Sequence, residues 1–545
     1  FGAAGDWVTL RDDAELNVGV RPEADLSRVR LLFDGGGHGT HVAGIVAGYE
    51  GPGSPWNGLA PGARILAIKV GNSRYGGPTT NLSIVRALEW AGQRGARVVN
   101  LSFGGSSFAG GAGTPDARAA DEAVERHGLL CCFSAGNDGP ALGTVGSPAT
   151  ARRVLSVGAY VSPETMRAAY AQLGPSPGER LFGFSSRGPT PGGDLGVSIL
   201  APGAAWSPVP SWQLVHSEKM NGTSMAAPQV AGAAALLLSA ALAEGVPASP
   251  ARMIRAIRAS ARPVPGLLPV EQGAGLLQLD RAYETLVRLR EAPAERELRA
   301  RVENATGTGG GIVDRGGAGG EPFDRDVEVS VVWPRTATNE ARLAFERRLV
   351  LEADAPWVEV PPRLVLNADG GSFSVRVDPR QLPEGVHGAL IHVRDPERTG
   401  MGDELTVPVT LVRPSAVLPD GRFSLSLSLT PGERTSRFLR VPAGASRVRL
   451  RATAGAGTPN QYTFGLATVE AWRRPDDRRT GARATLSAGD GVDLAASVIA
   501  GTVVELVAFS HWNANQPGAL ALEGRFEGPI ARQNQWLFVS DWMAN

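Results

Sequence analysis

The stretch "TSMAAPQVAGAAALLLSAALAEG", residues 223–245, decides the fold. It is long enough for about six helical turns and is apolar on nearly every side, so we expect a helix that other elements surround. Pro228 lies close enough to its start to be tolerated. A helix of this kind is typical of the centre of a large domain, and the preceding sequence indicates what covers it.

Short apolar runs alternate with helical patterns before this central helix. We expect helices at 81–95 and 114–128, and strands at 64–70, 96–103, 129–136 and 154–160. This alternation is typical of a parallel sheet with helices on both faces. Two amphipathic helices follow the central one, at 249–261 and 276–292. The sequence therefore predicts an α/β domain over residues 1–292.

The pattern changes to short alternating strands in the second half of the chain. Residues 293–325 are rich in glycine and predict a linker. Strand-like runs follow in two groups, 327–333, 372–378, 389–395 and 405–412, then 422–429, 446–454, 502–509 and 519–526. We expect two β-sandwich-like domains, an immunoglobulin- or fibronectin-like one over residues 326–414 and a jelly-roll-like one over residues 415–545.

Composition excludes several classes of partner. The 545 residues carry 54 Lys+Arg and 54 Asp+Glu, and this net charge of zero gives no reason to expect nucleic acid. No run reaches about 18 uninterrupted apolar residues, so we expect no membrane span.

Cys131 and Cys132 are neighbours in an expected strand and point to opposite faces, which predicts buried free thiols. Few cysteines slightly favour the cytoplasm, secretion stays open, and the scarcity of lysine indicates a GC-rich, bacterial genome.

Two glycine-flanked segments carry side chains suited to catalysis. In "NGTSMAAP" (221–228), Ser224 stands at the start of the central helix, where the helix dipole would stabilise an oxyanion. Taken alone, this serine could equally be an N-cap. In "SAGNDGP" (134–140), Asn137 follows a buried strand, and its amide could donate to a tetrahedral intermediate or simply form part of a turn.

A third segment, "FDGGGHGTHVAG" (33–44), holds two histidines three residues apart. His38 is a candidate general base. His38 and His41 could instead bind a metal ion, although no third ligand has a recognisable spacing, or either could be structural. We predict no cofactor and no required metal.

The three segments occur together in the order His, Asn, Ser, each at the edge of the predicted sheet. In this the chain resembles the subtilisin-like serine peptidases over roughly residues 30–290. The resemblance implies that His38 is the general base, Ser224 the nucleophile and Asn137 the oxyanion-hole side chain. It also implies substrate contacts at Ser102, Phe103, Gly104, Gly136, Gly146 and Thr223. Gly146 would leave room for a bulky substrate side chain.

Further segments are similar to the tripeptidyl-peptidase II-like subtilases. These are "VGAYVSPETM" (157–166), "FSSRGPTPGGDLGVSILAPG" (184–203), "VPSW" (209–212) and "MNGTSM" (220–225). In that group two glutamates hold the free amino terminus of the substrate, and their positions correspond here to Thr79 and Gly105. Neither residue can pair with an ammonium group, and Glu89, the nearest acid, lies in an expected helix.

We therefore expect an open-ended cleft and a serine endopeptidase that acts on peptides or unfolded proteins. A tripeptidyl exopeptidase and a non-catalytic peptide-binding protein are the alternatives. The relatives of this group assemble into large complexes, so the β-rich domains could build a homo-oligomer.

The acid of the expected triad has no clear candidate. In the family it follows an apolar strand and precedes Ser/Thr-Gly, and no such segment occurs before His38. Asp6 lies at the usual interval but lacks the strand, whereas Asp34 follows "VRLLF" and leads straight into the histidine turn. We expect the acid to lie upstream of this sequence, on a strand that would also complete the parallel sheet.

Overall fold

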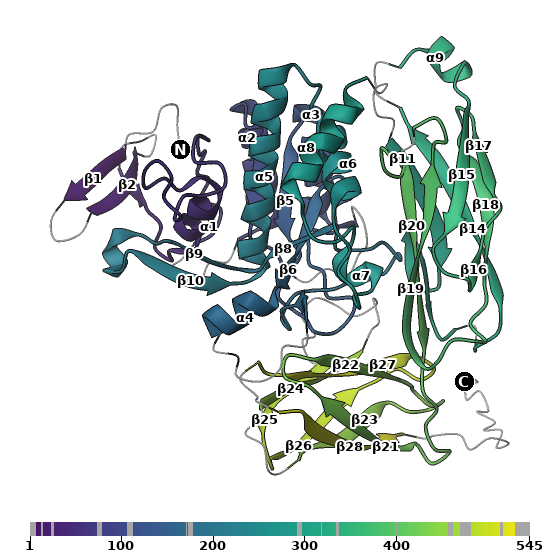
Figure 1. Cartoon of the computed structure of the whole chain (residues 1–545). Coiled ribbons are helices and arrows are strands. Elements are labelled where there is room, and N and C mark those ends of the chain that lie inside the picture. Colours follow the sequence, from purple (N-terminus) through teal and green to yellow (C-terminus); the bar gives the residue numbers. More distant parts are fainter. Residues whose placement is uncertain are drawn as a thin grey trace, which may run out of the picture.

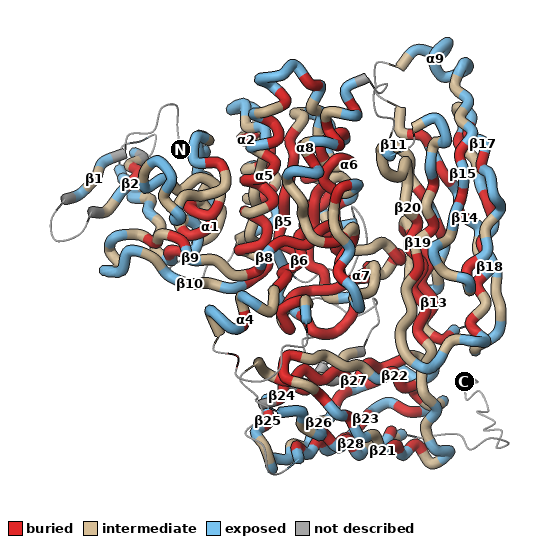
Figure 2. Tube along the Cα trace, viewed as in Figure 1, coloured by how far each residue is buried: buried red, intermediate tan, exposed pale blue. Residues whose placement is uncertain are grey.

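Helix α5 (Thr223–Glu244) is the buried centre of the first domain, as the sequence predicts (Figure 2). Alanine, valine and leucine side chains along α5 share one core with β5 (Leu130–Ser134), β6 (Leu155–Val161) and β8 (Ile199–Pro202). By length and composition α5 is the one described helix that could cross a membrane, but 67% of its most apolar window is buried inside the protein. Its apolar character is therefore that of a core helix.

The chain folds into an α/β domain and two β-sandwiches that lie against one another (Figure 1). The computed structural model describes residues 7–11, 15–22, 25, 27–72, 79–105, 113–170, 172, 178–291, 297–317, 319–333, 337–398, 400–455, 461–468, 481–512 and 516–528.

The sheet of the first domain is mainly parallel and has helices on both faces, which confirms the predicted fold class. Strands β4 (Val98–Leu101), β5, β6 and β8 run parallel, and β7 (Arg180–Leu181) pairs antiparallel with β6. Helices α2 (Asn81–Gln93) and α3 (Pro115–His127) pack on one face. Helices α5, α6 (Pro250–Ser260) and α8 (Leu279–Arg288) pack on the other.

The two cysteines mark the two faces of this sheet. Cys131 belongs to the core under α2 and α3, and Cys132 to the core around α5. Both are buried and free, as predicted. Burial raises the pKa of both thiols, which are therefore protonated and unreactive.

Smaller elements surround this core. The remaining helices of the first domain are α1 (His38–Ala47), α4 (Pro163–Tyr170) and α7 (Pro269–Gln272), with single 3₁₀ turns at Ser211–Gln213 and Leu289–Glu291. Strands β1 (Trp7–Arg11), β2 (Glu15–Pro22) and β3 (Val29–Leu32) form an antiparallel sheet, and β9 (Ala204–Pro208) and β10 (Ser217–Asn221) form a hairpin. The hairpin lies near α1 and braces the histidine segment (Figure 1).

The prediction of a strand at 64–70 is wrong. These residues form no regular element, and Ile65 and Leu66 are 50% and 42% exposed. A strand in a parallel sheet needs a hydrogen-bonded neighbour. Among the described strands β4 ends the sheet, and none of them pairs with 64–70.

Two sandwiches follow, consistent with the predicted fold class. The first has sheets β12-β11-β14-β18-β16 and β13-β20-β19-β15-β17, and the second has β21-β28-β23-β26 and β22-β27-β24-β25. Eight strands in two four-stranded sheets with this order form a jelly roll.

The elements of the first sandwich are β11 (Glu297–Asn304), β12 (Gly307–Gly309), β13 (Ile312–Arg315), β14 (Phe323–Val332), α9 (Asn339–Leu343), β15 (Arg347–Ala353), β16 (Val358–Glu359), β17 (Arg363–Leu366), β18 (Gly371–Val377), β19 (Gly385–Arg394) and β20 (Leu405–Arg413). Those of the second are β21 (Arg422–Leu429), β22 (Arg434–Arg440), β23 (Arg447–Ala454), β24 (Gln461–Thr468), β25 (Gly481–Ser487), β26 (Gly491–Ser497), β27 (Val503–Ser510) and β28 (Gly518–Glu527).

The glycine-rich segment 293–325 is not a linker over its described part. It contains β11, β12, β13 and the start of β14. The glycines are needed for close backbone packing against the first domain. A Cβ on Gly309 would lie 2.4 Å from the carbonyl oxygen of Gly192, and one on Gly311 would lie 2.2 Å from that of Gly193.

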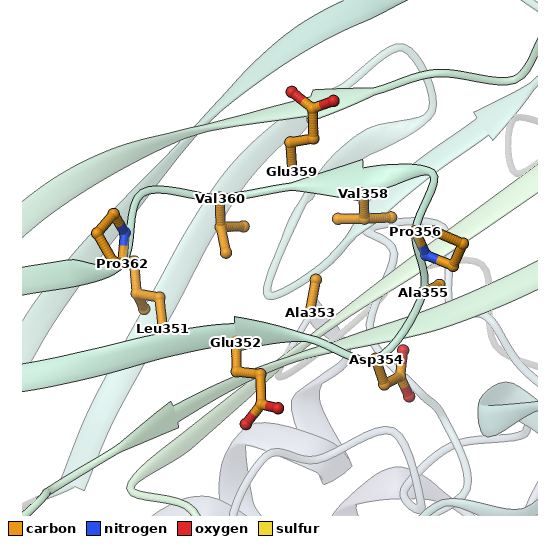
Figure 3. A pocket seen from close by; sticks show the side chains of 10 residues that line it. All are labelled: Leu351, Glu352, Ala353, Asp354, Ala355, Pro356, Val358, Glu359, Val360 and Pro362. Atoms are coloured by element: carbon orange, nitrogen blue, oxygen red, sulfur yellow. The ribbon is translucent and has the colours of Figure 1, made fainter.

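The first sandwich also carries a shallow hollow of about 470 Å³ between β15 and residues 355–362. Figure 3 shows Ala353, Val358 and Val360 facing one another there, while Glu352 and Glu359 point away. The hollow is therefore an open end of the sandwich core, without converging polar groups.

Candidate active site

One cleft brings the predicted site residues together. It has a volume of about 370 Å³ and lies where the parallel strands end. Its lining residues are His38, Ser102, Phe103, Gly104, Gly105, Ser134, Ala135, Gly136, Asn137, Asp138, Gly146, Thr223 and Ser224. All the residues expected to bind substrate or do chemistry are among them, apart from the two candidate acids.

Ser224 lies at the start of α5 and is half-buried. The N-cap of this helix is Gly222, and no side chain caps it, so the alternative reading of Ser224 as the N-cap is wrong. Its Oγ is 3.5 Å from the carbonyl oxygen of Ser102, and the Ser102 hydroxyl donates to the Ser224 carbonyl at 2.8 Å. The Ser224 hydroxyl thus faces the cleft at the positive end of a 22-residue helix.

Asn137 lies three residues after the end of β5 and is exposed in the cleft. Its Oδ1 accepts two hydrogen bonds from Thr223, from the backbone N–H at 3.0 Å and from the hydroxyl at 2.9 Å. A Cβ placed on Gly222 would lie 3.4 Å from Asn137 Nδ2 and 3.5 Å from Ser224 N. Asn137 Nδ2 and Ser224 N therefore lie near the same point beside the serine, and two N–H donors near one point can stabilise a developing oxyanion.

Thr223 and Ser186 hold the turn that carries Asn137. The Thr223 hydroxyl accepts from Gly136 N at 3.3 Å, and Ser186 Oγ accepts from Asp138 N at 3.1 Å. Gly136 has φ 114°, and a Cβ there would lie 2.8 Å from Ser186 Oγ. Thr223 was expected to contact substrate, and here its polar groups orient Asn137. Sequence reasoning missed Ser186, because nothing local connects it to Asp138, which lies 48 residues earlier.

His38 is the first residue of α1 and lies at the cleft. Although the residue as a whole is exposed, the protein atoms around its ring partly desolvate it and lower the pKa of the imidazole. The nearby His41 lowers this pKa further, and the Asp34 carboxylate opposes the shift. A neutral imidazole is the form that can accept a proton. No described residue forms a hydrogen bond with the His38 ring.

His41 is fully buried beneath the β9–β10 hairpin, and its Nε2 lies 2.9 Å from the carbonyl oxygen of Glu218. Within the described ranges, no group of three or more His, Cys, Asp or Glu residues could hold a metal ion. The geometry of His41 is that of a structural histidine.

Asp34 caps the start of α1. Its carboxylate accepts from Gly36 N, Gly37 N, and both the N–H and the hydroxyl of Thr40, at 2.7–3.2 Å. Burial alone would raise its pKa, but these hydrogen bonds hold the pKa below its usual value. Asp6 lies outside the described residues. The described part of the chain thus contains no carboxylate bonded to His38.

The two positions that carry glutamates in the related group have different surroundings in this structure. Thr79 donates its hydroxyl to the Val70 carbonyl at 2.8 Å. Gly105 is exposed at the cleft and forms a two-bond bridge with Ser147. Glu89 does not line the cleft, because its carboxylate binds Arg126 and His127 on the surface of α2 and α3.

Gly146 lies beside this bridge. A Cβ there would approach the Gly105 carbonyl oxygen to 2.5 Å. Glycine at position 146 is therefore required for the close approach of two backbone segments, besides leaving space in the cleft.

Known protein families match this chain in the order of its domains. Residues 19–290 match the subtilase family, and residues 298–412 match the first Ig-like domain of tripeptidyl-peptidase II. Tripeptidyl-peptidase 2 of Arabidopsis thaliana is 36% identical over 520 residues, which covers 91% of this chain and 37% of that protein. The enzyme of the same name from Drosophila melanogaster is 31% identical over 540 residues, covering 95% and 37%.

The three-dimensional structure is also similar to that of a known protein. A crystal structure of Tripeptidyl Peptidase 2 superposes with a TM-score of 0.80 at 29% identity, covering 96% of this chain and 42% of that one. The chain thus spans a little over a third of the length of these curated relatives. They are eukaryotic, so a bacterial source gains no support from them.

Proposed function

The chain belongs to the subtilase family of serine peptidases, among its tripeptidyl-peptidase II-like members, and on this premise we propose that it is an endopeptidase. The observation that carries the peptidase assignment is the pair of donors, Asn137 Nδ2 and Ser224 N, that border one space beside the Ser224 hydroxyl.

The proposed reaction is acyl transfer to Ser224. Ser224 Oγ attacks the scissile carbonyl while His38 takes its proton, and the carbonyl oxygen becomes an oxyanion held by Asn137 Nδ2 and Ser224 N. His38 then gives the proton to the leaving amine, and water releases the acyl group by the same steps. Residues 102–104, which follow β4 and line the cleft, offer backbone groups to an extended peptide.

The orientation of His38 is the incomplete part of this proposal. Asp34 is engaged at the helix start, so we propose that the acid comes from outside the described residues. Reading the complete open reading frame upstream of this sequence tests this directly. A strand ending in Asp before Ser/Thr-Gly is the expected result.

Endopeptidase specificity rests on the amine-binding positions. Thr79 and Gly105 carry no charge, and Asp138 is the one acid that lines the described cleft. Asp138 follows Asn137 in the sequence and occupies neither amine-binding position, so a cleft without a charge at those two positions accepts the interior of a peptide.

The second candidate is a tripeptidyl exopeptidase, which the names of the relatives favour. The third, a peptide-binding protein without activity, would follow if no acid orients His38, because loss of that acid costs about four orders of magnitude in rate.

The experiment compares an N-acetylated chromogenic peptide with its free-amine twin, using the complete reading frame and Ser224→Ala as control. Equal cleavage that the control abolishes supports the endopeptidase. Cleavage of the free-amine peptide alone supports the exopeptidase. Cleavage of neither peptide overturns the peptidase proposal and favours the binding protein.

Assembly is a separate proposal. We propose that the β-rich domains support homo-oligomers, and sedimentation of the chain with and without residues 415–545 measures this. A monomer at all concentrations contradicts it.

A further inference from the structure

A ten-residue loop joins the two sides of the cleft. It starts at Asn137 and ends at Gly146, both of which line the cleft. Neighbouring residues of the same domain hold part of its backbone, since Gly139 N donates to the Phe184 carbonyl at 2.9 Å and Thr144 N to the Arg187 carbonyl at 2.8 Å. The middle of the loop, residues 140–142, makes further contacts.

The middle of the loop is held by the jelly roll. Strands β22 and β27 face the first domain, as Figure 1 shows. Arg434 Nε on β22 donates to the Pro140 carbonyl at 2.6 Å, and Glu505 Oε2 on β27 accepts from Leu142 N at 2.9 Å. Charged side chains from a domain about 300 residues away thus bind two backbone groups of the loop.

These side chains belong to a buried row of four ion-paired side chains whose charges alternate in sign. Arg434 bonds Glu505 at 2.8 Å and Glu271 at 3.3 Å, and Glu271 bonds Arg187 at 3.0 Å. Exposure of the four side chains runs from 0% at Glu505 to 14% at Arg434. Buried charges are costly unless each is paired. This row of four paired charges therefore fixes the two domains in one relative position.

An apolar cluster also lies where all three domains meet. Its buried members are Leu142, Val270, Val412, Phe438 and Val503. Leu142 is itself a loop residue, so its side chain and its N–H are both held by the junction.

We propose that Arg434 and Glu505 are positioning residues of the active site, and that docking of the jelly roll completes the oxyanion hole by fixing the loop behind Asn137. This rests on the proposed function. A displacement of about 1 Å in a catalytic group can cost about a hundredfold in rate. Undocking of the jelly roll should therefore lower catalysis even though none of the described jelly-roll residues lines the cleft.

The test replaces Glu505→Gln, which keeps the shape of the side chain and removes its charge. The matched control is Glu404→Gln. Glu404 is also a buried interdomain glutamate, 2% exposed, that binds Arg255 of α6 at 3.0 Å and Arg398 at 3.3 Å, and it makes no contact with the loop. Thermal unfolding of both variants measures the fraction folded, because either substitution breaks a buried pair.

For Glu505→Gln we expect kcat to fall at least tenfold with KM within about threefold of wild type. Affinity for a peptidyl boronate, whose adduct with serine imitates the tetrahedral intermediate, should fall in parallel. Glu404→Gln should leave both unchanged. Hydrogen exchange at residues 138–146 should increase in the first variant only.

Arg434→Lys is the second variant, for the case that Glu505→Gln does not fold. Lysine keeps the charge but cannot reach Pro140, Glu271 and Glu505 together, so a smaller loss of kcat is expected. If either folded variant matches Glu404→Gln in kcat and boronate affinity, the inference is overturned. If the wild type cleaves no peptide, the proposed function fails instead, and the hydrogen-exchange comparison still decides whether the jelly roll holds the loop.

Discussion

Thr223→Val tests whether Thr223 orients the oxyanion donor. The side chain is fully buried, and valine has nearly its shape. The substitution removes the hydrogen bond to Asn137 at 2.9 Å and the one from Gly136 N at 3.3 Å. A net value of about 1 kcal/mol for each gives about 2 kcal/mol, or roughly thirtyfold in rate if all of it reaches the transition state.

Two considerations bound this figure. The backbone N–H of Thr223 still holds Asn137 Oδ1 at 3.0 Å, which reduces the loss. The largest possible effect is complete loss of an oxyanion donor, about 10²–10³ in kcat. We therefore expect kcat to fall about 10- to 100-fold with KM nearly unchanged, since the hydroxyl acts on the transition state and not on bound substrate.

The assay is steady-state cleavage of the acetylated chromogenic peptide by the complete protein. Thr223→Ser keeps the hydroxyl and is the control, expected within about threefold of wild type. The reasoning is refuted if Thr223→Val retains wild-type kcat, or if Thr223→Ser loses as much as Thr223→Val.

Three further predictions concern specificity and the catalytic base. Thr79→Glu combined with Gly105→Glu should make kcat/KM for a free-amine peptide about fivefold higher than for its acetylated twin, since an exposed ion pair contributes up to about 1 kcal/mol. Equal values would show that these positions do not face the amino terminus. Asp34→Ala should lower the free energy of unfolding by about 1–2 kcal/mol through loss of the cap and change kcat less than tenfold. A fall of about 10⁴ in kcat would instead identify Asp34 as the triad acid. Because desolvation and His41 lower the pKa of His38 where no carboxylate is bonded to its ring, any activity of residues 1–545 alone should be lost as the pH falls through a value below about 6.5, measured from kcat/KM. An acid limb above that value would indicate a carboxylate bonded to the ring.

Helices and strands whose burial follows from the pattern of apolar residues within the element itself could be predicted from the sequence. Helix α5 is apolar on all sides, and β5 and β6 are continuous apolar runs, as strands covered on both faces must be. The site segments were recognisable for a related reason. Each carries its catalytic side chain within a few residues of glycines that the turn requires, such as Gly136 with its φ of 114°.

Features that depend on distant partners could not be predicted. The run 64–70 has the composition of a buried strand, but no described strand pairs with it. The glycines near residue 310 indicated a linker, whereas their lack of side chains serves packing against Gly192 and Gly193. The bond from Arg434 to Pro140 joins residues 294 apart, and an arginine in a β-rich segment carries no local sign of such a role.

On the proposed function, cleavage chemistry and substrate length depend on different parts of this molecule. The oxyanion donors are constrained by packing: Thr223 is fully buried, Gly136 has no room for a Cβ, and the loop beyond Asn137 is held by two other segments. Gly105 is the opposite case, because a Cβ there meets nothing within 4 Å and its φ is not in the left-handed region. A glutamate could occupy that position without disturbing the fold. On the proposed function, the same scaffold can therefore support endo- or exopeptidase specificity, with the residues at such exposed positions deciding between them.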